Sequence, residues 1–213
     1  MTCRVVVLLS GRGSNFQAIA EAGLPIDIVA VVSNRPQAAG LAYARERGLT
    51  AVALDHTHHP DRAAFDVLLA DEIERHRPDL VVLAGYMRIL SPAFIARFEG
   101  RLLNIHPSLL PMFPGLKTHE RALEEGVKIH GCTVHFVTAQ LDHGPIVIQA
   151  AVPVRADDTP AALAARVLAQ EHRIYPQAVR WFAEGRLVNI HGRVNLKDDT
   201  TSQSVLWTEN PGT

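Results

Sequence analysis

Asn104 and His106 lie two positions apart in an otherwise apolar stretch, and Pro107 follows directly. Residues two apart on a β-strand point to the same face, so both side chains would lie together at the carboxyl end of a strand. In open α/β sheets, ligands bind at that end. Together with the distant carboxylate of Asp142, an amide and an imidazole suit acyl-type chemistry, in which one group binds an oxyanion, one moves a proton and one tunes it. The spacing alone is also typical of hydrogen-bonded turns, so the surrounding residues must decide.

The segments that must position these residues alternate between strand and helix. Aliphatic runs typical of buried strands occupy 4–9, 26–32, 50–54, 80–84 and 102–105. Helices are expected over 14–22, 38–47, 62–75, 92–98 and 118–125, with Ser14 and Asp61 as N-terminal caps. This alternation predicts an α/β fold with a doubly wound, mostly parallel sheet and helices on both faces. The last strands, 132–137 and 146–154, lack an intervening helix and predict an antiparallel C-terminal portion, followed by a long helix over 161–184.

The composition is that of one globular domain. The chain has 213 residues, of which 47% are hydrophobic and 20% charged, with a formal net charge of -1. The charge gives no basic excess for a nucleic-acid surface, and no apolar run is long enough to cross a bilayer. Because the first residues lack a secretory signal pattern, we expect a cytoplasmic protein. As separate expectations, it binds small molecules and is a monomer or weak homodimer.

The C-terminal part is more polar than the rest. We expect a single domain over 1–190 and a polar, weakly ordered C-terminal extension over 191–213, in which Trp207 is the only large aromatic residue.

A glycine-rich turn, Ser10 to Phe16, falls between the first strand and the first helix. Glycines allow a tight turn and close backbone approach to a ligand, so the turn is a plausible phosphate cradle. It is a poor dinucleotide fingerprint, because Phe16 occupies the third glycine position and no acidic residue ends the second strand. A strand–helix turn without a ligand is the alternative. A further cluster, His56, His58, His59 and Asp61, lacks the spacing of a zinc site, so we expect a solvated loop and no metal.

The run Asn104-Ile-His-Pro-Ser-Leu-Leu-Pro111, followed by Pro114-Gly115, resembles the signature of the folate-dependent formyltransferases, in particular the phosphoribosylglycinamide formyltransferases of purine synthesis. The resemblance covers residues 4 to 190. It implies transfer of a formyl group from 10-formyltetrahydrofolate to the amine of glycinamide ribonucleotide without a metal. It also implies that Asn104 and a protonated His106 donate hydrogen bonds to the oxyanion, while Asp142 favours the charged imidazole.

The resemblance also implies two groups of binding residues. Those for the ribonucleotide are Gly13, Ser14, Asn15, Leu168, Ala169, Gln170 and Glu171. Those for folate are Arg62, Met87, Arg88, Ile89, Leu90, Asn104, Thr138, Ala139, Gln140, Leu141 and Asp142. His135 alternates with apolar neighbours, and we expect it to face the site from behind the catalytic residues.

Three rival functions share parts of this pattern. Formyltetrahydrofolate hydrolases have the same Asn-x-His and Asp residues and use water as acceptor. Methionyl-tRNA formyltransferases share the Ser-Leu-Leu-Pro run and carry an RNA-binding domain with a basic surface. A non-catalytic folate-binding module on the same fold is the third rival, since a fold does not fix a function.

Overall fold

The computed structural model describes residues 2–197 and 202–206, and within them the main sheet has eight strands in the order β10-β7-β6-β5-β4-β1-β2-β3. The first five strands run parallel where they pair, β6 runs antiparallel to β5 and β7, and β10 runs parallel to β7. This confirms the predicted mostly parallel sheet with an antiparallel C-terminal portion. The strands are β1 (Cys3–Leu9), β2 (Ile26–Ser33), β3 (Ala51–Ala53), β4 (Leu80–Leu83), β5 (Leu102–His106), β6 (Ile129–Phe136), β7 (Ile146–Pro153) and β10 (Ser204–Leu206).

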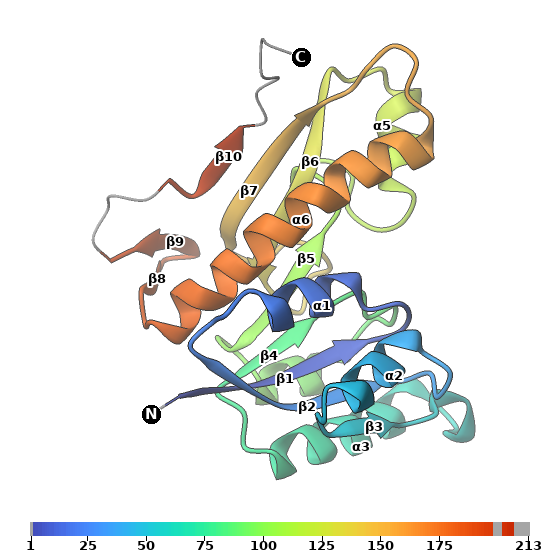
Figure 1. The fold of residues 1–213 in the computed structure, drawn as a ribbon, viewed down its shortest axis with the longest axis vertical. Coiled ribbons are helices and arrows are strands. Elements are labelled where there is room, and N and C mark those ends of the chain that lie inside the picture. Colours follow the sequence, from blue (N-terminus) through green and yellow to red (C-terminus); the bar gives the residue numbers. More distant parts are fainter. Residues whose placement is uncertain (1, 198–201, 207–213) are drawn as a thin grey trace.

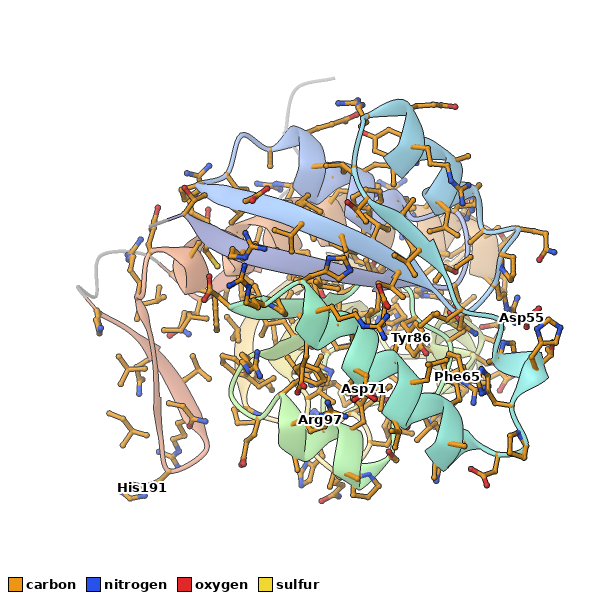
Figure 2. The ribbon with its side chains drawn as sticks, turned by 90° about the horizontal axis from the view of Figure 1, so that it is seen from below. Asp55, Phe65, Asp71, Tyr86, Arg97 and His191 are labelled. Carbon is orange, nitrogen blue, oxygen red and sulfur yellow. The ribbon has the colours of Figure 1, made fainter. Side chains whose placement is uncertain are left out.

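Helices cover both faces of the sheet (Figure 1). One face packs against α1 (Ser14–Glu21), α2 (Ala39–Glu46), α5 (Thr118–Glu124) and the long α6 (Pro160–Ala183), and the other against α3 (Arg62–Arg75) and α4 (Pro92–Arg97). Alternate residues of β1 therefore enter two different cores: Val5 and Val7 face α1 and α6, whereas Val6 faces α3. Figure 2 shows the second face, where Asp71 of α3 meets Arg97 of α4 at 2.8 Å.

The helix ends show which local signals were correct. The side chain of Asp61 accepts a hydrogen bond from the Ala64 amide at 2.8 Å, as its predicted role as N-cap requires. The predicted cap at Ser14 is wrong: α1 begins at Ser14, and Gly13 in the left-handed region (φ 76°) is its N-cap without a side-chain bond. The glycine turn sets the start of this helix, because only its backbone conformation lets the chain leave β1 and enter the helix so abruptly.

The C-terminal segment contains strands that its polar composition did not predict. β8 (Leu187–Ile190) and β9 (Arg193–Leu196) form an antiparallel hairpin across the expected boundary at residue 190, and β10 lies along the edge of β7. Val194 and Leu196 are buried against the main core, so this part of the extension packs on the domain. Figure 2 shows His191 at the outer tip of the hairpin. Trp207 lies outside the described residues.

The order of the sheet reverses beside β1. From β1 the chain adds β2 and β3 on one side and then places β4 and β5 on the other. The antiparallel strands β6 and β7 follow next to β5. The carboxyl ends of β1 and β4 therefore flank the point where an open α/β sheet usually binds its ligand. A short 3-10 helix, η1 (His56–His58), follows β3 at the same edge of the sheet.

Candidate active site

A cavity of about 800 Å³ opens at the carboxyl ends of β1, β4 and β5. It brings together residues that are far apart in the sequence and that we had assigned to the site. They are Asn15, Met87, Arg88, Ile89, Leu90, Asn104, His106, Thr138, Ala139, Leu141, Asp142 and Glu171. Other predicted binding residues do not line this cavity: Gly13, Ser14, Arg62, Gln140, Leu168, Ala169 and Gln170.

The amide of Asn104 is oriented by His135. The two residues face each other across the β5–β6 pair, and Asn104 Nδ2 lies 3.2 Å from His135 Nε2. His135 Nδ1 lies 3.0 Å from the Phe136 carbonyl oxygen, which can only accept, so Nδ1 carries the proton and Nε2 accepts from Asn104. Burial lowers the pKa of His135, which favours this neutral form. The second N–H of Asn104 is then left for a ligand oxygen.

His106 lies between two oxygen atoms. Its Nε2 is 3.0 Å from the carbonyl oxygen of Phe113, and its Nδ1 is 3.6 Å from Oδ2 of Asp142. Because a carbonyl only accepts, Nε2 carries a proton in this arrangement. Oδ2 of Asp142 also accepts a hydrogen bond from the Gly115 amide at 2.8 Å. The loop that follows β5 thus holds both members of the pair, whose side chains are only 7% and 9% exposed.

Asp142 reaches His106 only because the β6–β7 loop folds back along β5. The Val137 amide bonds to the Leu102 carbonyl, so β6 ends beside the first residue of β5, four positions before His106. At a rise of about 3.3 Å per residue, the loop must return ~13 Å to bring a carboxylate to the imidazole. The five residues from 138 to 142 can span that distance. Asp142 itself has φ 51°, a conformation that aspartate adopts more readily than most residues.

A second polar pair also lines the cavity. Asn15, at the start of α1, donates from Nδ2 to Oε2 of Glu171 on α6 at 2.7 Å. Both residues are buried, and Oδ1 of Asn15 has no hydrogen-bond partner. Burial raises the pKa of Glu171, while the bond from Asn15 opposes this shift. The pair therefore presents the Glu171 carboxyl group to the cavity, held in place by the Asn15 amide.

Tight packing holds the glycine turn on α2. The Gly40 amide donates to the Gly11 carbonyl at 3.1 Å. A Cβ atom on Gly40 would come within 2.6 Å of the Leu9 side chain, so this position accepts only glycine without rearrangement. The turn thus has a fixed backbone next to Asn15.

Comparison with known proteins identifies the family. A family model described as formyl transferase matches residues 3–179. The chain belongs to the formyl transferase family. Its sequence is 52% identical over 187 residues to the phosphoribosylglycinamide formyltransferase of Escherichia coli (strain K12), which covers 86% of this chain and 88% of that protein.

Solved structures of formyl transferases share the whole fold. The chain superposes on glycinamide ribonucleotide transformylase 1 from Symbiobacterium toebii with a TM-score of 0.90 and 51% identity, over 92% of this chain and 95% of the other. The phosphoribosylglycinamide formyltransferase from Coxiella burnetii also gives a TM-score of 0.90, with 43% identity, over 98% of this chain and 100% of the other.

In this formyl transferase, large apolar side chains surround the cavity and remain exposed. Met87 and Ile89 are 61% and 56% exposed, and Leu116 and Leu141, on two other loops, are 73% and 54% exposed. Exposed apolar side chains gathered around one cavity mark a ligand surface, because a flat apolar ligand would cover them.

Two histidines near the site were not predicted from the sequence, which gave only a helix around His119 and no element at His130. His119 of α5 lines the cavity, and its ring centroid is 5.3 Å from that of the buried His130 on β6. Burial lowers the pKa of both, and that of His130 falls to about 4. The sequence offered one signal for His119, because Thr118-His119 directly follow the loop that carries Gly115.

Within residues 2–197 and 202–206, no group of three or more His, Cys, Asp or Glu side chains is placed to hold a metal ion. Over the same residues, no helix is long and apolar enough to cross a membrane.

Proposed function

We propose that this protein transfers the formyl group of 10-formyltetrahydrofolate to the amine of N1-(5-phospho-D-ribosyl)glycinamide, as a cytoplasmic enzyme of purine biosynthesis that acts on small molecules. The observation that carries the proposal is one cavity lined both by Asn104, His106 and Asp142 and by the Asn15–Glu171 pair. The first group suits an acyl-type transition state, and the pair suits a polyhydroxylated acceptor.

At the reacting end, the amine attacks the formyl carbon and the carbonyl oxygen takes up negative charge. The N–H of Asn104 that is not bound to His135 donates to this oxygen. The N–H of His106 Nε2 donates to the same oxygen after its hydrogen bond to the Phe113 carbonyl has broken. The bond from the formyl carbon to the folate nitrogen then breaks. That nitrogen gains one proton and the amine loses one, and Asp142 beside His106 stabilises the charged imidazole during the transfer.

The acceptor end distinguishes a transferase from a hydrolase. Glu171, held by Asn15, would accept hydrogen bonds from ribose hydroxyls, and the fixed backbone of the glycine turn next to Asn15 suits the phosphate. Gly13 and Ser14 belong to this turn, so we assign them to the phosphate even though they do not line the cavity itself. A hydrolase, whose acceptor is water, has no need of such a pair.

The part of the cavity that we assign to folate offers exposed apolar side chains together with backbone hydrogen-bonding groups. The loop from Met87 to Leu90 and the loop from Thr138 to Asp142 form two walls with exposed apolar side chains. Such walls suit a flat heteroaromatic ring, whose edge would bond to backbone groups. We assign Arg88 and the exposed Arg62 to the carboxylate end of the folate, because a guanidinium pairs well with a carboxylate.

The test follows the absorbance of 10-formyl-5,8-dideazafolate as purified protein deformylates it, with and without glycinamide ribonucleotide. Deformylation that requires the ribonucleotide supports the transferase. Deformylation at the same rate without it means a hydrolase, and binding without reaction in either case means a non-catalytic module.

A further inference from the structure

Ser10 occupies the switch point of the sheet, directly after β1 and before the glycine turn. The residue is 4% exposed, and its hydroxyl makes two hydrogen bonds to other segments. It donates to Oδ1 of Asn34, which follows β2, at 2.6 Å, and it accepts from the amide of Met87, which follows β4, at 2.8 Å. One hydroxyl therefore joins the ends of three parallel strands.

The backbone adds to this junction. The Ser10 amide donates to the Gly85 carbonyl at 3.1 Å, and the next residue, Gly11, bonds to Gly40 on α2. Asn34 is itself only 1% exposed. A movement of the glycine turn at Gly11 would thus be transmitted through Ser10 to Met87, the first exposed apolar residue of the folate wall.

We propose that Ser10 is a positioning residue that couples the glycine turn to the 85–90 loop. On the proposed function, these are the ribonucleotide and folate sides of the cavity, so one hydroxyl links the binding of the two substrates. Replacement by alanine leaves the partly buried Met87 N–H and the buried Asn34 Oδ1 without their partner, and both loops lose a common anchor. Ser10 itself contacts neither reacting group.

Ser33 offers a matched control one strand away. It ends β2, is fully buried, and its hydroxyl bonds only to the backbone of Arg35, at 3.0 Å and 3.1 Å. Ser33→Ala removes the same chemical group from a comparable place without breaking a link between segments. A stability loss common to both variants is therefore separated from loss of coupling.

The first measurement is hydrogen–deuterium exchange of the ligand-free protein in peptides covering 11–17 and 85–91. Ser10→Ala should speed exchange about 5- to 30-fold in both peptides, as expected for loss of one buried hydrogen bond, whereas Ser33→Ala should leave both unchanged. Ser10→Cys, which keeps the volume with a weak donor, should behave like alanine, and Ser10→Thr should restore slow exchange. Unchanged exchange in the 85–91 peptide of Ser10→Ala and Ser10→Cys would overturn the proposal.

The second measurement links the proposal to the substrates. Calorimetric titration of 10-formyl-5,8-dideazafolate, with and without saturating glycinamide ribonucleotide, gives the ratio of the two dissociation constants. In the wild-type protein this ratio should differ from one, and Ser10→Ala should bring it close to one. A wild-type protein that binds neither ligand contradicts the proposed function, while the exchange result still decides the role of Ser10. Ligand binding with equal ratios in wild type and Ser10→Ala overturns the coupling alone.

Discussion

Replacement of Asn104 by alanine should reduce turnover far more than it reduces stability. Asn104 is partly exposed to the cavity, and its Nδ2 has one N–H bound to His135, while we assign the other to the ligand oxygen. The substitution removes that second donor, and loss of one oxyanion donor typically lowers kcat by ~10²–10³, which corresponds to about 2.7–4 kcal/mol. The Michaelis constants should change less, because the oxygen becomes strongly charged only in the transition state.

A variant of His135 should give a second, smaller loss of kcat with which the effect of Asn104→Ala can be compared. His135→Phe removes the acceptor that fixes the Asn104 amide, and a typical hydrogen bond contributes about 1 kcal/mol, so the amide should lose roughly a fivefold preference for its productive orientation. We expect kcat to fall several-fold in this variant. In the double variant the two losses should not add, because without Asn104 there is no amide left to orient.

The assay is ribonucleotide-dependent deformylation of 10-formyl-5,8-dideazafolate at saturating substrates. Asn195→Ala, at an exposed position of β9, serves as the matched control and should keep wild-type turnover. Circular dichroism melting must show that each variant is folded. If Asn104→Ala kept more than about one third of wild-type kcat, the assignment of Asn104 as oxyanion donor would be refuted.

Three further predictions concern other buried polar groups. Glu171→Gln should raise the KM for glycinamide ribonucleotide about tenfold with little change for folate, and equal effects on both in steady-state kinetics would contradict its assignment. Burial lowers the pKa of His130 from 6.5 to about 4, so the folded state binds fewer protons, and up to ~3 kcal/mol of stability present above pH 6.5 should disappear as the pH falls to 4. Urea unfolding at both pH values should show a smaller loss for His130→Gln, and an identical loss would exclude this residue as the source. Asp158→Asn should lower the free energy of unfolding by about 1–2 kcal/mol, because a bidentate bond to Arg166 lowers the Asp158 pKa from 3.8 to about 2. This contribution is present above pH 4 and is lost as the pH falls toward 2. An unchanged thermal unfolding midpoint at pH 7 would show that the pair adds nothing.

The parallel half of the fold could be predicted because its signals are local. Each buried strand is a continuous aliphatic run, and caps such as Asp61 mark where a helix begins. The hairpin β8–β9 gave no such signal, since its burial comes from two residues, Val194 and Leu196, that pack on a core formed elsewhere in the chain. Tertiary packing, which one short polar segment cannot reveal, stabilises these strands.

The site was predictable in part for the same reason. The shared face of Asn104 and His106 follows from the two-residue period of a strand, and the structure places both side chains on the cavity. Ser10 bonds to residues 24 and 77 positions away, and the His119–His130 contact joins residues 11 positions apart. No local sequence pattern indicates such pairs. For Asp142 the only guide was the family resemblance, because its approach to His106 depends on the path of the β6–β7 loop.

The register of β6 against β5 decides whether these residues form a site at all. A slip by one residue would turn every side chain of β6 to the other face and separate His135 from Asn104. Two features hold the register. The Thr133 hydroxyl donates to the Ser108 carbonyl and accepts from the Leu110 amide, so it ties β6 to the loop that follows His106. A Cβ atom on Gly131 would come within 2.9 Å of the Leu109 side chain, in the loop after β5, and would overlap the Ala150 carbonyl of β7, so a slip that put a larger residue there would be disfavoured on both sides of β6. The orientation of the Asn104 amide therefore rests on a hydroxyl and a glycine that do not line the cavity.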